Sequence, residues 1–144
     1  MASLPILWIE ARVHAHATED EDRVRAALGA ALPAGEDRRE ALEGHMGNPI
    51  VRIVRRVDAS APIRQTWEAW RASGILEALG ADGGSRLDDE GVLHMRFDKQ
   101  EAYLGRLVLV RETDAIDVRV RLAAHPAKPE AFRRVAAALL AGGE

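Results

Sequence analysis

The chain of 144 residues contains no cysteine. That absence excludes disulfide bonds, thiolate catalysis and cysteine-based zinc sites, and it is typical of a reducing compartment, so we expect a cytoplasmic protein. Long apolar runs are also missing, since no stretch approaches the ~18 residues that cross a membrane. The first ten residues lack a basic segment and a small-residue cleavage site, and therefore do not predict a signal peptide.

Lysine is scarce as well. Lys99 and Lys128 are the only lysines among 20 basic residues, which leaves 18 arginines. Arginine binds phosphate through two parallel hydrogen bonds and stacks on bases, which lysine does not. Biased coding or adaptation to salt or heat explains the same preference, and the net charge of -3 does not favour nucleic acid by itself. The positions of the arginines therefore matter more than their number.

Hydrophobic periodicity predicts a sheet covered by helices. Alternating apolar residues indicate strands at residues 6–16, 38–46, 50–57, 91–98 and 115–122, and a continuous apolar run indicates a buried strand at residues 106–111. Three main helices are expected to begin near Thr18, Pro62 and Pro129, with Thr18 and Glu21 forming a capping box. Residues 1–144 suit a single domain. We expect an α+β fold: a two-layer sandwich in which a mostly antiparallel sheet of about six strands carries three main helices on one face.

The other face of this sheet is expected to be open and basic. Reading the outward positions along each strand gives six arginines and three histidines: Arg12, His14, His16, Arg52, Arg56, His94, Arg96, Arg119 and Arg121. Asp98 and Asp117 are the only carboxylates expected beside them, because the other acidic residues concentrate in helix starts and loops. An acidic protein with one basic sheet face is typical of a platform for anions.

Two further features lie outside the strands. His45 and Asn48 belong to a Gly-rich loop. Its preferred interpretation is a tight connection between strands, and the alternative is a contact for phosphate or a base edge. Lys99 is either a solvated residue at a helix start or a phosphate contact. Because the tryptophans and phenylalanines, apart from Trp8, are expected in the core, RNA binding would depend on arginine and phosphate rather than on aromatic stacking.

Catalytic motifs are missing. The sequence has no G-x-S-x-G elbow, no phosphate-binding P-loop and no G-x-G-x-x-G, and Asp88–Glu90 reads as a solvated turn. We therefore expect no enzyme and no cofactor. His14 and His16 share one strand face and form a minor alternative, a metal site that His94 and Asp98 would complete if their strand lay alongside.

Several motifs in order resemble one known family. They are residues 14–19, 44–49, 87–91, 96–100, 103–105 and 124–128, and they resemble the archaeal RNA-binding proteins described as predicted exosome subunits with a double-stranded-RNA-binding-like fold. The similarity runs over nearly the whole chain. It implies an α+β sandwich also seen in a ribosomal protein, RNA as the partner, and a link to exosome-type RNA processing. It carries over no catalytic residue.

The residues and the resemblance together predict a non-catalytic RNA-binding protein. The expected contacts are Arg12, His14, His16, His45, Asn48, Arg52, Arg56, His94, Arg96, Lys99, Arg119 and Arg121. The expected partners are RNA and RNA-processing proteins, with no membrane. The alternative is an interaction module in which the same face binds an acidic partner or a second copy in a homodimer.

Overall fold

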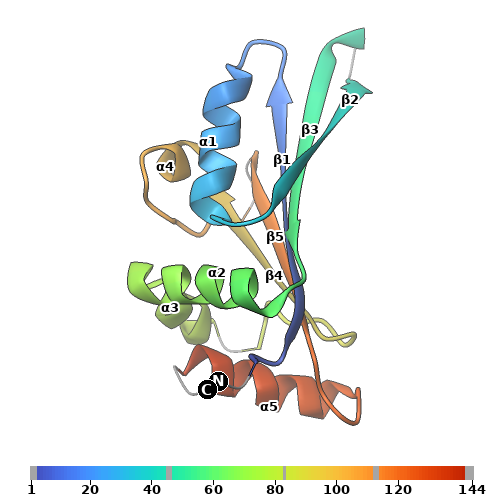
Figure 1. Ribbon diagram of the computed structural model, residues 1–144, viewed down its shortest axis with the longest axis vertical. Helices are drawn as coiled ribbons and strands as arrows, with labels where there is room; N and C mark the ends of the chain where they lie inside the picture. Colours follow the sequence, from blue (N-terminus) through green and yellow to red (C-terminus); the bar gives the residue numbers. More distant parts are fainter. Residues whose placement is uncertain (1–2, 45–46, 83, 112–113, 142–144) are drawn as a thin grey trace.

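The computed structural model describes residues 3–44, 47–82, 84–111 and 114–141. Within these ranges the chain forms five strands and five helices (Figure 1). In chain order they are β1 (Ile6–His16), α1 (Glu21–Ala31), β2 (Glu36–Glu43), β3 (Pro49–Val57), α2 (Ser60–Ser73), α3 (Ile75–Ala81), β4 (Val92–Asp98), α4 (Lys99–Tyr103), β5 (Ala115–Leu122) and α5 (Pro129–Leu140).

The strands form one open antiparallel sheet in the order β2-β3-β1-β5-β4. The helices lie against one of its faces, with α1 and α4 towards one end and α2, α3 and α5 towards the other (Figure 1). The predicted α+β sandwich is therefore confirmed. The expected number of about six strands is wrong, because the described residues form five, and two short helices, α3 and α4, are present besides the three longer helices α1, α2 and α5.

The strand expected at residues 106–111 does not form. This segment runs beside the outer edge of β4 and makes one bridge, between Phe97 and Leu109. Val108 is 39% exposed, so the apolar run is not buried on both faces as its composition suggested. Two backbone hydrogen bonds, Asp98 N to Val108 O and Val110 N to Arg96 O, hold it there but do not extend into a ladder.

The helix ends follow their capping chemistry, with one shift from expectation. α1 is capped by Asp20, whose side chain accepts from the Asp22 N–H, and not by Thr18 as predicted. Asp98 caps α4 by accepting from the Glu101 N–H. Gly74 separates α2 from α3 with a φ of 85°, a left-handed conformation that a side chain would strain.

The core lies between the helices and one face of the sheet. Trp67 and Trp70 of α2 are fully buried, and Trp70 packs edge-on against Phe97 of β4 at 6.2 Å between ring centroids. The Trp70 indole N–H donates to the Ala31 carbonyl at the end of α1, which joins two helices through the core. None of the helices in the described part of the chain has the length and apolar character that crossing a membrane requires.

Charged residues of β3 and β2, among them Arg55, lie on the helix side of the sheet. Arg55 pairs in register with buried Ala11 of β1, so its side chain points towards the helices. It donates to Asp37 of β2 and to the Leu32 carbonyl just after α1. These hydrogen bonds with Arg55 lower the pKa of Asp37, against a partial burial that raises it. Arg55 is therefore a structural residue and no part of the open face.

Candidate nucleic-acid interface

The open face brings most of the predicted basic residues together. Cross-strand register places Arg56, Glu10, Arg119 and His94 in one row across β3, β1, β5 and β4. The remaining expected residues on these strands occupy positions of the same parity on the same face: Arg12, His14, His16, Arg52, Arg96 and Arg121. The period-two alternation of each strand therefore placed these side chains correctly.

Three carboxylates that we did not expect share this face. Glu10 of β1 lies between Arg56 and Arg119, while Glu36 and Glu40 of β2 pair in register with Arg56 and Arg52. The alternation of β1 already contained the signal for Glu10, because this residue has the same parity as Arg12. Glu36 was harder to find, since β2 begins two residues earlier than its apolar pattern suggested, whereas Glu40 lies within the predicted strand.

The carboxylates pair with the arginines of β2, β3 and β1. Glu10 lies 3.2 Å from Arg12 and 3.5 Å from Arg56. Glu40 accepts from Arg52 at 2.8 Å, and this hydrogen bond lowers the pKa of Glu40. We call this region the paired half; its arginines are Arg12, Arg38, Arg52 and Arg56, each within 4 Å of Glu10 or Glu40.

The arginines of β5 and β4 have different surroundings. Arg119 and Arg96 are exposed, and Arg121 lies over the Phe132 ring at 5.8 Å. Arg96 donates to the carbonyl of Arg111 at 3.1 Å. Among the residues that the structure describes, Arg96, Arg119 and Arg121 form no ion pair with a carboxylate. We call these three residues, with His94, the unpaired half, in the sense that its arginines lack a carboxylate partner.

His94 is held by a turn. Its Nε2 lies 2.9 Å from the Asp88 carboxylate, and Asp88 also accepts from the N–H groups of Glu90 and Val92. Partial burial raises the pKa of Asp88, but these hydrogen bonds outweigh it and leave the pKa below its ordinary value. Asp88 therefore stays ionised at neutral pH and orients the imidazole of His94 beside Arg119.

His14 lies in the paired half, opposite Arg52 in register. Burial lowers the pKa of His14, and the positive charge of Arg52 lowers it further. His14 is therefore neutral at neutral pH. It can offer a hydrogen bond to RNA, but it adds no positive charge to the face.

Lys99 occupies neither of its expected environments. It is 8% exposed, and its Nζ donates to the His14 carbonyl, the Glu19 carboxylate and the Asp114 carboxylate at 2.7, 3.0 and 2.7 Å. The ladder between β1 and β5 ends at Arg12 and Asp117, so β1 continues past it without a strand partner on that side. Lys99 supplies the donor that a strand would have given the His14 carbonyl.

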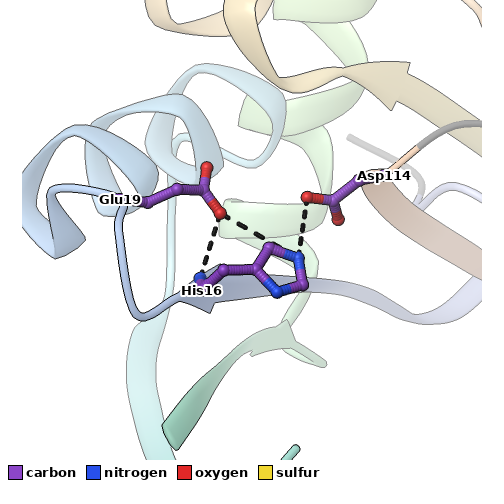
Figure 2. Close-up of side chains that lie close together, drawn as sticks. All are labelled: His16, Glu19 and Asp114. Atoms are coloured by element: carbon purple, nitrogen blue, oxygen red, sulfur yellow. Dashed lines mark hydrogen bonds and ion pairs between the residues drawn. The ribbon is translucent and has the colours of Figure 1, made fainter. Parts of the chain in front are cut away.

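His16 belongs to the same group of side chains. Figure 2 shows Glu19 and Asp114 on either side of its ring, with Asp114 Oδ2 at 3.0 Å and Glu19 Oε1 at 4.0 Å from Nε2. His16, Glu19 and Asp114 offer ligand atoms within 4.8 Å of one another. The same two carboxylate oxygens hold the Lys99 ammonium. The Lys99 ammonium therefore already occupies the position between these carboxylates that a metal ion would need.

The metal ligands expected for His14 and His16 do not assemble. β5 lies between β1 and β4, so the strand that carries His94 and Asp98 is not adjacent to the two histidines. Asp98 caps α4 and His94 contacts Asp88.

The loop between β2 and β3 lies at the opposite side of the sheet from β4. Asn48 is exposed there, and its carbonyl accepts from the Gly44 N–H at 2.7 Å. His45 falls outside the described residues. Asn48 therefore sits beside the paired half and far along the sheet from the unpaired half.

The fold and this face together define a class of protein. A small α+β sandwich with helices on one side and exposed guanidinium groups across the other resembles the sheet platforms on which several RNA-binding domains hold RNA. A family model described as RNA binding matches residues 8–122 of this chain. The chain belongs to this RNA-binding family, and the resemblance drawn from its ordered motifs is confirmed.

Individual relatives agree with this assignment. The RNA-binding protein PAB1135 of Pyrococcus abyssi is 34% identical over 134 residues, covering 85% of this chain and 86% of the relative. The structure of Mth689, a DUF54 protein from Methanothermobacter thermautotrophicus, is 32% identical with a TM-score of 0.82, covering 94% and 98% of the two chains. A UPF0201 protein from Methanococcus jannaschii, 18% identical with a TM-score of 0.63 over 91% and 93%, shares the fold.

Proposed function

We propose that the protein binds RNA through the open sheet face and that the unpaired half makes the main phosphate contacts. The observation that carries this proposal is the exposure of Arg96 and Arg119 without a carboxylate partner among the described residues. An arginine already paired with a carboxylate must exchange that partner for phosphate, whereas an unpaired one gains a charge-assisted hydrogen bond outright.

The spacing of the unpaired half suits a polymer of phosphates. Arg96 and Arg119 lie on adjacent strands and are offset diagonally, since Arg119 pairs with His94 and Arg96 with Asp117. Diagonal neighbours on one sheet face lie ~7–8 Å apart, which lets two long side chains reach successive phosphates of one strand. His94, fixed by Asp88, adds a hydrogen-bonding group beside them.

A salt series tests the proposal. Gel shifts with single-stranded and structured RNA are expected to show binding that weakens as salt rises. If about five phosphates are contacted, the log–log slope is roughly -3.5 for a single strand. If the protein binds no RNA, or if its affinity does not change with salt concentration, the proposal is contradicted.

The role we assign is non-catalytic binding, with an association with exosome or other RNA-processing proteins in the cytoplasm. Pull-downs before and after RNase treatment separate this role from the alternative of a protein-interaction module. Partners lost with the RNA favour RNA binding. Partners that survive RNase, or a homodimer whose formation buries Arg96 and Arg119, favour the alternative.

A further inference from the structure

A pocket of about 590 Å³ lies along the outer edge of β4. Arg86 and Leu87, which precede the strand, line one part of it, and Val110 and Arg111, which follow α4, line another. His94 and Arg96 of β4 lie between these two segments. The volume falls within the range of pockets that hold small molecules, and one nucleotide is of that size.

The pocket exists because the edge of β4 is covered in two separate places. The His94 N–H donates to the Arg86 carbonyl at 2.8 Å, and the Val110 N–H donates to the Arg96 carbonyl at 2.9 Å. In an antiparallel strand the N–H and C=O of one residue point to the same side. The His94 carbonyl and the Arg96 N–H therefore also point outward, into the interval between the two covering segments.

These two backbone groups have no partner among the residues that the structure describes. An edge strand with a free donor and a free acceptor offers hydrogen bonds to any ligand that enters. A nucleobase carries donors and acceptors on its edge, so it can use both kinds of group.

Both apolar and charged side chains surround this edge. Val110 is a partly buried apolar residue that can cover one face of a ring, whereas Leu87 packs against the hydrophobic core. Arg96 and Arg111 are exposed, whereas Arg86 is held by Asp82 at 2.5 Å. Carboxylates of Asp88 and Asp117 also line the pocket and disfavour a small, highly charged anion. The combination suits a ligand with one phosphate and a flat, polar-edged ring.

We infer that this pocket binds one unpaired nucleotide of a bound RNA strand, with the base against Val110 and the free backbone groups of β4, and the phosphate at Arg96 or Arg111. The inference rests on the proposed function and adds to it a preference for unpaired RNA. A base inside a duplex is stacked and paired, and bringing it out costs a few kcal/mol, so single strands and loops enter the pocket more easily.

A pair of variants on one segment tests the inference. Val110→Trp fills the pocket without changing charge, and Val108→Trp makes the same substitution two residues away at an exposed position that does not line the pocket. The probes are a twelve-nucleotide single-stranded RNA and a fully paired RNA duplex. If circular dichroism shows that Val110→Trp is unfolded, Ser85→Tyr fills the same pocket from the segment that precedes β4.

Filling the pocket is expected to weaken single-strand binding about tenfold, the scale of one lost base contact, and to leave duplex binding within twofold. Val108→Trp is expected to match the wild type on both probes. Equal binding of single strands by the wild type and the filled variants overturns the inference while leaving RNA binding intact. A wild type that binds neither probe overturns the proposed function and this inference together.

Discussion

The two halves of the open face carry similar numbers of arginines but differ in their partners. In the paired half, Glu10 and Glu40 lie within 4 Å of four arginines on β1, β2 and β3. In the unpaired half, Arg96 and Arg119 have no carboxylate partner among the described residues. The number of arginines on a surface is therefore a poor guide to its affinity for phosphate, because the carboxylates beside them decide how much charge is available.

The largest expected effect comes from removing the available charge. The double variant Arg96→Ala/Arg119→Ala is expected to weaken RNA binding about a hundredfold, since each hydrogen bond to a charged group contributes ~1.5–3 kcal/mol. The log–log salt slope should become shallower by about 1.4 for a single strand. Gel shifts over a salt series measure both quantities.

The matched control removes two arginines from the paired half. Arg52→Ala/Arg56→Ala deletes the same total charge from the same sheet face, but these side chains already contact Glu40 and Glu10. We expect a loss of only a few fold. Equal losses from the two double variants would remove the distinction between the halves.

Substitution of Lys99 tests whether this positive charge stabilises the fold or binds RNA. Lys99→Met leaves Glu19 and Asp114 facing each other and the His14 carbonyl without its donor. The free energy of unfolding should fall by ~2 kcal/mol, less than for a fully buried pair because both carboxylates are partly exposed. Urea denaturation measures this. RNA affinity of the folded variant should match the wild type, and a selective loss of affinity would instead make Lys99 a contact.

Neutralising a carboxylate of the paired half should leave its arginines without an ion-pair partner, as in the unpaired half. Glu10→Gln releases Arg12 and Arg56 from their ion pairs, so RNA binding should strengthen by about threefold and its salt dependence should steepen. Glu77→Gln, on α3 at the helix side, removes the same charge away from the face and serves as the control. A similar gain from both variants would point to net charge alone.

The smallest expected effect concerns His14. Its pKa is lowered by burial and by Arg52, so the folded protein binds this proton less tightly than the unfolded chain does. The resulting contribution to stability is therefore complete above the ordinary pKa of histidine and is lost as the pH falls from there through the lowered pKa of the folded state. An NMR titration should place the His14 midpoint below that of a model histidine. Arg52→Ala should raise it only in part, and a midpoint at the ordinary value would contradict the assignment.

Alternation along the strands was sufficient to predict which residues share the open face. Arg12, His14 and Arg119 lie where their parity placed them. Pairing was harder to predict, because an ion pair between Glu40 and Arg52 depends on the order of strands and on their register. Arg55 shows the same limit: it interrupts the apolar alternation of its strand, and its contacts with Asp37 and Leu32 on the helix side depend on how β2, β3 and α1 are arranged.

The prediction of a strand at residues 106–111 was wrong for a different reason. The apolar composition of this segment predicts a buried strand, but whether such a segment pairs depends on the edge beside it. Here β4 is already bridged by Leu87 at Leu93, and residues 106–111 add a bridge only at Phe97. Composition alone contains no information about how much of an edge remains free. The pocket at β4 follows from that incomplete pairing and was not predictable from the sequence.

Ultraviolet crosslinking of a bound single-stranded RNA, followed by identification of the crosslinked peptides, tests the distinction between the halves most directly. We predict crosslinks in peptides that contain β4 and β5, around His94, Arg96 and Arg119. Crosslinks confined to β2 and β3, around Arg38 and Arg52, would contradict the account.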